Sequence, residues 1–151
     1  MSKKDDQALQ LDAQLCFPLY AASNLLTRLY RPLLDELGLT YPQYLVMLVL
    51  WEQAPASVGE LSQKLYLDSG TLTPLLKRLE AAGLVRRQRS AEDERRVEVS
   101  LTKKGQALKK QAQDIPGAMG CRIGLGAEEF VSLRSELRGL MHLLGEAHAR
   151  I

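Results

Sequence analysis

The sequence has few cysteines and histidines and no long apolar run. No stretch approaches the length of a membrane span, and the first residues lack the apolar region of a secretion signal. The two cysteines, Cys16 and Cys121, are too few and too far apart for a secreted disulfide framework, so we expect thiols in a reducing cytoplasm. His142 and His148 are not spaced with them like zinc ligands. These absences predict a cytoplasmic protein without membrane contact, metal or cofactor.

Residues 57–101 have the organisation of a winged helix-turn-helix. Residues 57–60, Ser-Val-Gly-Glu, form a capping box that starts a short helix. Asp68 or Ser69 is suited to cap a second helix. The apolar stripe of that helix is formed by Leu72, Leu75, Leu76 and Leu79. Gly83 is suited to the left-handed conformation that ends a helix.

Alternating residues after Gly83 predict two strands, over 84–89 and 97–101, joined by a polar loop. Two helices with a short turn, followed by a hairpin tipped with arginines, are typical of DNA binding. We expect hydroxyls and cations of the second helix to contact phosphates or base edges, and Arg95, oriented by Asp93, to enter a minor groove. The candidate DNA-contacting residues are Ser69, Thr71, Thr73, Pro74, Lys77, Arg78, Arg87, Arg89, Asp93, Arg95 and Arg96.

Positive charge is concentrated on this module. Between Glu60 and Lys110 there are twelve Lys and Arg against seven Asp and Glu, a net charge of +5, whereas the whole chain carries +2. Helix-helix-hairpin units also serve as protein-interaction modules, and a row of arginines is often only a solvated face. The concentration of charge favours DNA over both alternatives, because phosphate contact requires it.

Amphipathic helical patterns flank the module. Residues 11–37 repeat apolar side chains at helical spacing, with Cys16 near the helix N-terminus. A further helix beginning at Pro42 is apolar nearly all round, so we expect it to be the buried centre of the module. Thr102 caps a helix over 103–122, which Pro116 should kink.

The last helix begins near residue 127 and carries an apolar seam spaced like that of a coiled coil. The seam residues are Phe130, Leu133, Leu137, Leu140 and Leu144. The seam could pack within one chain. We favour a homodimer, because two recognition helices on a palindrome need a two-fold axis. The predicted fold is therefore mainly α with a small β-hairpin: a lobe over 39–101 and dimerisation helices over 11–37 and 103–151.

Four segments of the chain resemble the MarR family of transcriptional regulators and, more narrowly, its organic-hydroperoxide-sensing branch. The Asp-x-Arg hairpin tip at 93–95 is typical of the whole family, and the segment 67–78 also carries the likeness. Segments 11–17 and 39–46 are specific to the branch. The resemblance covers nearly the whole chain and implies a dimeric repressor that binds palindromic operator DNA.

The resemblance also implies a role for Cys16. In this branch the N-terminal cysteine reacts with peroxide, and tyrosines fourteen and twenty-five positions later hydrogen-bond it across the dimer; Tyr30 and Tyr41 stand at those offsets, with Tyr20 as a further supporting phenol. In two-cysteine members a cysteine near the C-terminus of the partner resolves the oxidised thiol. Cys121 stands where that cysteine is expected.

The chemistry of the residues is compatible with this role. A thiol near a helix N-terminus, with phenolic donors at its sulfur, is favoured as the thiolate that attacks peroxide, and the resulting sulfenic acid condenses with a second thiol. Three alternatives stay open: Cys16 as a buried small hydrophobe, a repressor released by a small aromatic ligand, and a thiol peroxidase. The last gives the basic module no task. We therefore predict a regulator and not an enzyme, with an organic hydroperoxide as its signal.

Overall fold

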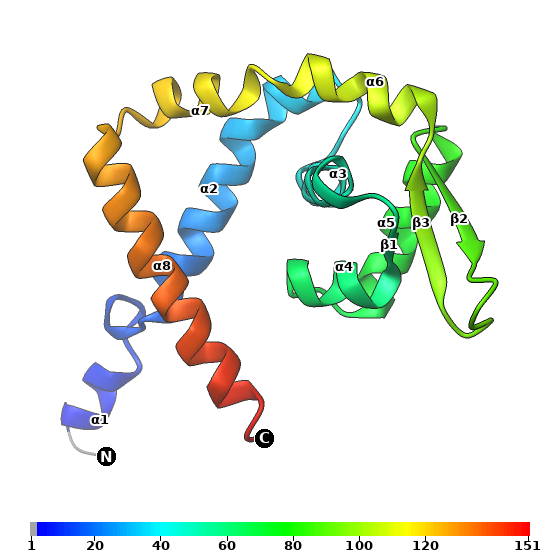
Figure 1. Ribbon diagram of the computed structural model, residues 1–151. Coiled ribbons are helices and arrows are strands. Elements are labelled where there is room, and N and C mark those ends of the chain that lie inside the picture. Colours follow the sequence, from blue (N-terminus) through cyan, green and yellow to red (C-terminus); the bar gives the residue numbers. More distant parts are fainter. Residues whose placement is uncertain (1–2) are drawn as a thin grey trace. The chain divides into compact units, whose positions relative to one another are not determined.

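The computed structural model describes residues 3–151, and it is mainly helical with one small antiparallel sheet, as the sequence predicts (Figure 1). The elements are α1 (Lys3–Ala8), a 3-10 turn (Leu11–Ala13), α2 (Cys16–Asp35), α3 (Tyr41–Gln53), β1 (Ala56–Ser57), α4 (Val58–Leu65), α5 (Ser69–Ala81), β2 (Val85–Arg89), β3 (Val97–Leu101), α6 (Lys103–Ala112), α7 (Ile115–Ile123) and α8 (Ala127–His148). The chain divides into two compact units, Met1–Ile115 and Pro116–Ile151.

Helix α3 is the centre of the first unit. Its start is a capping box: the Gln43 amide donates to Thr40 Oγ1 at 3.4 Å, and the Thr40 amide donates to Gln43 Oε1 at 2.9 Å. Val46, Met47 and Leu50 are buried, as expected for a helix that is apolar on most sides. The helix packs against α2, α4, α5 and α6.

The two helices of the predicted helix-turn-helix are confirmed. The Glu60 amide donates to Ser57 Oγ at 3.1 Å and the Ser57 amide donates to Glu60 Oε2 at 2.6 Å, which starts α4. Asp68, rather than Ser69, caps α5. The predicted stripe of α5 is buried along its whole length: Leu72, Leu75, Leu76 and Leu79. Local hydrogen bonds and one apolar face therefore produce this motif.

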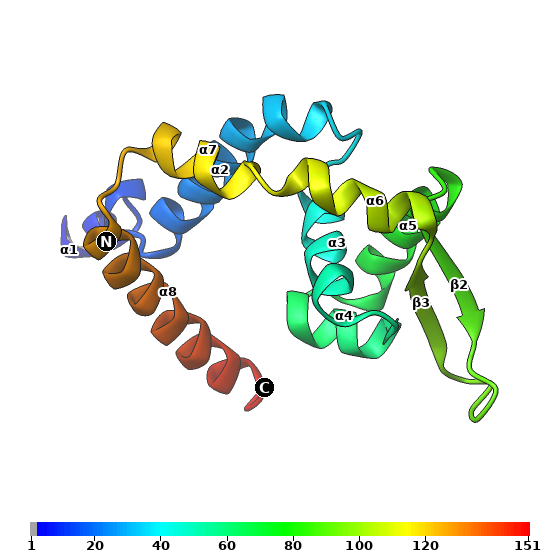
Figure 2. The same ribbon diagram turned by 45° about the horizontal axis from the view of Figure 1, so that its top comes forward.

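The hairpin lies in a sheet of three strands, ordered β1-β3-β2. Strands β2 and β3 pair as predicted, with Val85 opposite Leu101 and Arg89 opposite Val97. Strand β1 was not predicted, and it pairs with β3, with Ala56 opposite Val99. The hairpin extends beyond the helices of the lobe, so its tip stands at the edge (Figures 1 and 2).

Two predicted helical segments are each divided in the structure. In the segment 11–37, helix α2 begins at Cys16, which the sequence analysis placed near the helix N-terminus, and a separate 3-10 turn precedes it. The expected kinked helix over 103–122 is two helices, α6 and α7. The break falls at residues 113 and 114, because Pro116 has no backbone N–H to donate four residues back and its ring would clash with the carbonyl of Ala112 in a continuous helix.

Among the helices that the structure describes, none is both long and apolar enough to cross a membrane.

A tight junction joins α6 to the lobe. Trp51 Nε1 donates to the Gly105 carbonyl at 2.9 Å, and Lys109 Nζ donates to the Trp51 carbonyl at 3.0 Å. Gly105 is buried, and a Cβ at this position would overlap the carbonyl oxygen of Leu84. The junction therefore leaves no space for any side chain at Gly105.

We expect Gly105→Ala to lower the free energy of unfolding by about 2 kcal/mol or more, since backbone must shift to admit the methyl group. Urea unfolding, followed by Trp51 fluorescence, measures it. Gly139→Ala in α8 is the matched control: a Cβ there meets nothing within 4 Å, so helix propensity should make this variant as stable as the wild type or more stable. Equal stability of the two variants would contradict the packing argument.

Candidate nucleic-acid interface and thiol site

The outer face of α5 carries the polar residues predicted to meet DNA. Ser69, Thr71, Pro74, Lys77 and Arg78 are exposed, opposite the buried leucine stripe. Thr73, also predicted, is partly buried. The arrangement presents small hydroxyl side chains at the helix start and cations further along, as a helix lying in a major groove requires.

Asp68 holds the start of this helix. Its Oδ1 accepts a hydrogen bond from the Thr71 amide at 2.7 Å. That bond and further hydrogen bonding with Thr71 hold the pKa of the Asp68 carboxyl below its usual value. The N-terminus of α5 is therefore held by an ionised cap.

The hairpin tip holds Arg95 in an ordered turn. Asp93 Oδ1 accepts from the Arg95 amide at 3.0 Å and lies 3.5 Å from Arg95 Nε. The Arg96 amide donates to the Asp93 carbonyl at 2.9 Å, which closes the turn. The Arg95 side chain is 94% exposed. The structure therefore brings Asp93 and Arg95 together as the sequence predicts, with the guanidinium projecting into solvent.

Arg87 and Arg96 are placed differently from Arg95. Arg87 donates through Nε and Nη2 to Glu80 Oε2, at 3.0 and 2.8 Å, and its backbone amide donates to Glu80 Oε1 at 3.0 Å. Arg96 Nη2 lies 3.3 Å from Glu60 Oε1. Arg89 is exposed on β2. Sequence reasoning missed both acids, because neither stands next to its arginine in the chain.

Hydrogen bonding keeps these two acids ionised. The Arg87 amide, then the Arg87 side chain, lowers the pKa of the Glu80 carboxyl. The Ser57 amide lowers the pKa of the Glu60 carboxyl, with a smaller contribution from Arg96. Both carboxylates therefore remain charged partners at neutral pH.

The cysteines are free thiols, and both are exposed. Cys16 is the first residue of α2, as predicted, and Tyr20 stands one turn further along, also exposed. Cys121 lies on α7, in the unit Pro116–Ile151.

Three tyrosines form a cluster where α2 and α3 meet. The ring centroids of Tyr30 and Tyr41 are 4.8 Å apart, and the ring of Tyr44 is 5.9 Å from that of Tyr30. Burial raises the pKa of all three phenols, so they are protonated at neutral pH and can donate hydrogen bonds. Tyr44 was not predicted. Its spacing of three residues from Tyr41 along α3 was the available signal.

Cys16 is the first residue of α2, whereas Tyr30 of the tyrosine cluster stands five residues before the end of that helix. Tyr30 is fourteen residues after Cys16 in one continuous helix, which separates their backbones by about 21 Å along its axis. Tyr41 contacts Tyr30 and shares this separation. Neither phenol can therefore reach Cys16 of its own chain.

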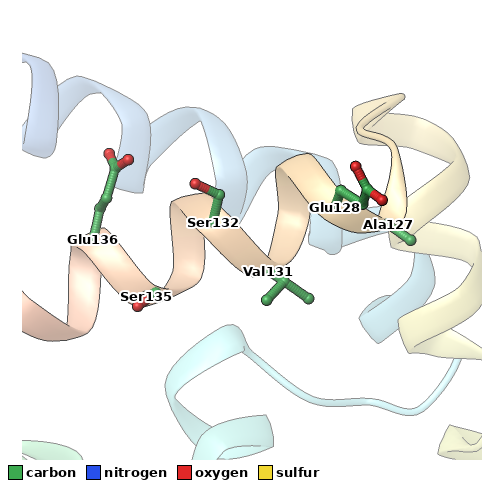
Figure 3. A pocket seen from close by; sticks show the side chains of 6 residues that line it. All are labelled: Ala127, Glu128, Val131, Ser132, Ser135 and Glu136. Carbon is green, nitrogen blue, oxygen red and sulfur yellow. The ribbon is translucent and has the colours of Figure 1, made fainter.

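Helix α8 is amphipathic but uncovered. Within the described chain, none of the residues Ala127–His148 is buried. The predicted seam residues Phe130, Leu133, Leu137 and Leu144 are between 42 and 54% exposed. Figure 3 shows a shallow hollow near the start of α8, where Ala127, Val131 and Ser135 point to one side and Glu128, Ser132 and Glu136 to the other. None of these six residues belongs to the seam. The exposed apolar seam, and not the hollow, has the character of a surface that a partner covers.

The fold and the basic face define the class of protein: a winged-helix DNA-binding transcriptional regulator. A family model described as "Transcriptional regulator SarA/Rot" matches residues 28–112. The chain is 49% identical to the organic hydroperoxide resistance transcriptional regulator of Bacillus subtilis, covering 95% of this chain and 97% of that one. It is 50% identical to the regulator TtmR of Methylorubrum extorquens, covering 96% of this chain and 73% of that one.

Solved structures show the same relationship. The reduced, DNA-bound form of AbfR, a protein of Staphylococcus epidermidis, matches with a TM-score of 0.72 and 38% identity, covering 93% of this chain and 99% of that one. AbfR is also known in a disulfide form, which matches with a TM-score of 0.60. This chain belongs to the MarR family of DNA-binding transcriptional regulators, which confirms the resemblance seen in its sequence. The relatives are regulators, not enzymes.

The ionised caps predict how stability depends on pH. A carboxyl whose pKa is lowered by folding contributes stability above its unfolded pKa, and this contribution is lost as the pH falls through the folded value. Asp68→Asn keeps a capping oxygen but cannot titrate. We expect the urea midpoint to be nearly equal for both proteins at pH 7, and to fall more steeply for the wild type on acidification below about pH 4. If the urea midpoints of the wild type and of Asp68→Asn fell in parallel below about pH 4, the Asp68 carboxylate would not have this role.

Proposed function

We propose that this protein is a redox-sensing repressor that binds palindromic operator DNA as a homodimer while Cys16 is reduced. An organic hydroperoxide oxidises Cys16, an intersubunit disulfide with Cys121 follows, and the protein releases DNA. The observation that carries the proposal is the separation of Cys16 from Tyr30 and Tyr41 along α2. We expect this to take place in the cytoplasm, where the operator lies.

The separation along α2 supports a dimer, because only a second copy of the chain could supply phenols to Cys16. If two α2 helices pack antiparallel about a two-fold axis, the start of one lies near the end of the other. The phenols of one protomer then donate to the thiolate of its partner. The uncovered apolar seam of α8 supports the same assembly, since such surfaces are usually covered.

The proposed oxidation balances without a cofactor. The Cys16 thiolate attacks one peroxide oxygen, the O–O bond breaks, an S–O bond forms, and the alkoxide leaves and is protonated to an alcohol. Sulfur is oxidised to the sulfenic acid by the two electrons that the peroxide gains. The Cys121 thiolate of the partner subunit then attacks this sulfur, forming the S–S bond and releasing hydroxide, which becomes water.

The disulfide couples this chemistry to DNA binding. Its formation requires the two Cα atoms to come within about 4.4–6.8 Å, which constrains α7 of one protomer against α2 of the other. A change in how the lobes are held alters the spacing of the two recognition helices, and a mismatch at the half-sites costs several kcal/mol. The names of two relatives support the proposal: one is a hydroperoxide resistance regulator, and AbfR exists in a reduced form on DNA and in a disulfide form.

The first test is a gel shift on the promoter fragment next to the gene for this chain, with and without cumene hydroperoxide. We expect the wild type to release DNA and a dithiol to restore binding, because the disulfide is reducible. Cys16→Ser should stay bound at every peroxide concentration. Cys121→Ser should form no crosslinked dimer on a non-reducing gel. Excess peroxide should then carry its Cys16 sulfenic acid on to sulfinic acid, which a dithiol does not reverse.

The same experiment tests the alternative in which a small aromatic acid, and not a hydroperoxide, releases the repressor from DNA. If a small aromatic acid released the repressor and Cys16 had no redox role, wild type and Cys16→Ser would both stay bound under peroxide, and salicylate would release both. Peroxide-dependent release of Cys16→Ser would also overturn the proposal.

The dimer is tested on its own. Leu137→Asp places a charge in the α8 seam, and we expect it to weaken dimerisation by at least about tenfold, measured by sedimentation velocity, because the carboxylate would be desolvated there. Val131→Asp is the matched control, since Val131 is 53% exposed and lies outside the seam. A dimer that tolerates both changes equally would show that the seam is not the interface.

A further inference from the structure

The arginines of the hairpin divide into two kinds. Arg95 is 94% exposed, whereas Arg87 is 26% exposed and bound through two guanidinium nitrogens to Glu80. Arg96 contacts Glu60 of α4 and lies 4.0 Å from Glu98. Residues of the same type, a few positions apart, are therefore either held by the helices or presented to solvent.

Sheet register explains why Arg87 belongs to the held kind. Arg87 stands opposite Val99, which is fully buried, and on the same face of β2 as Val85, which packs in the core. Its side chain therefore leaves the sheet on the side of α5. Glu80, in the last turn of α5, meets it there.

Glu80 also accepts a hydrogen bond from the backbone of the edge strand. Strand β2 is an edge strand, so some of its amides point away from β3. The Arg87 amide is one of them, and it donates to Glu80 Oε1. One carboxylate thus binds both the backbone and the side chain of Arg87. These two contacts join strand β2 of the hairpin to α5, the helix predicted to lie in the major groove.

The second pair ties down the other end of the hairpin. Glu60 holds the Ser57 amide through Oε2 and Arg96 through Oε1, so it links the start of α4 to the start of β3. Arg96 directly follows Arg95 in the chain. The Arg96–Glu60 contact therefore fixes the place from which the Arg95 side chain leaves the tip.

We propose that Glu80–Arg87 and Glu60–Arg96 are positioning pairs: they set the angle of the hairpin against α4 and α5 and so deliver Arg95 to the DNA. Arg87 then does not neutralise a phosphate, since its fork is occupied by a carboxylate. The proposal rests on the DNA binding of the family and not on the redox chemistry of Cys16. It stands or falls separately from the proposed function.

The energetics of such pairs favour a geometric role over a stabilising one. Ion pairs that remain partly exposed add little to folding stability. Their removal should therefore leave a folded protein whose hairpin is less well held, and the effect should appear in DNA binding.

The direction in which Glu80→Gln changes the affinity for DNA distinguishes a positioning role of Arg87 from direct contact with a phosphate. Glu80→Gln removes a negative charge next to the DNA-binding face. If Arg87 contacted phosphate, this change would strengthen binding or leave it unaltered, because it frees the guanidinium and lowers repulsion. If the pair positions the hairpin, Glu80→Gln weakens binding.

The experiment measures the dissociation constant on the labelled promoter fragment at several salt concentrations, by fluorescence anisotropy. We expect Glu80→Gln and Arg87→Gln to weaken binding by similar factors, about five- to twentyfold, and the double variant to bind no worse than the weaker single one. The salt dependence should be unchanged by Glu80→Gln, whereas Arg95→Gln should reduce its slope by about one. Hydroxyl-radical footprints should lose protection at the hairpin site and keep it at the recognition-helix site.

Controls keep the result interpretable. Arg87→Lys retains the charge without the fork, so it should bind as weakly as Arg87→Gln; full affinity would show that only the charge matters. Arg86→Gln changes an exposed neighbour on β2 and should not show the coupling to Glu80. Glu60→Gln keeps a capping oxygen and tests the second pair in the same way. Binding of Glu80→Gln that equals or exceeds that of the wild type overturns the proposal, and circular dichroism of each variant verifies folding.

Discussion

The contact between Gly105 and the Leu84 carbonyl is the constraint on which the DNA-binding lobe depends. The Thr102 amide and hydroxyl both donate to the same carbonyl, and Trp51 of α3 donates to the Gly105 carbonyl. The end of β3, the start of β2 and the start of α6 therefore meet at backbone atoms. Backbone contacts of this kind cannot relax by changing rotamers, so the direction in which α6 leaves the lobe is fixed. A displacement of α6 would therefore be transmitted to the lobe as a rigid-body movement.

The length of α2 imposes the second constraint. A thiol at its first residue and a phenol cluster near its far end cannot form one site within a chain. In the proposed dimer the same two-fold axis completes two kinds of site: it brings each thiol to the partner's phenols and pairs the two recognition helices. Chemistry at the first site and geometry at the second are thus coupled by symmetry. That coupling is what a redox-controlled repressor requires.

The elements of the lobe could be predicted from the sequence because their causes are local. The caps at Ser57 and Asp68 act within three residues, and the leucine stripe of α5 needs only helical periodicity. Strand β1 could not be predicted, since two residues carry no periodicity and their pairing with β3 is long-range. The break between α6 and α7 carried a signal in Pro116, but the sequence does not tell whether a proline bends a helix or ends it. Pro32, by contrast, is accommodated inside α2.

The sequence by itself determined the winged helix-turn-helix, the basic charge of that module and the offsets of Tyr30 and Tyr41 from Cys16, because each follows from residue type and spacing. Tertiary structure alone decided which arginine side chains of the hairpin are exposed and which bind a carboxylate. Whether a cation on a hairpin faces solvent or a carboxylate depends on sheet register and on which helix packs beneath it. The sequence alone does not distinguish Arg87 from Arg95. They differ because Glu80 stands under one of them and water surrounds the other.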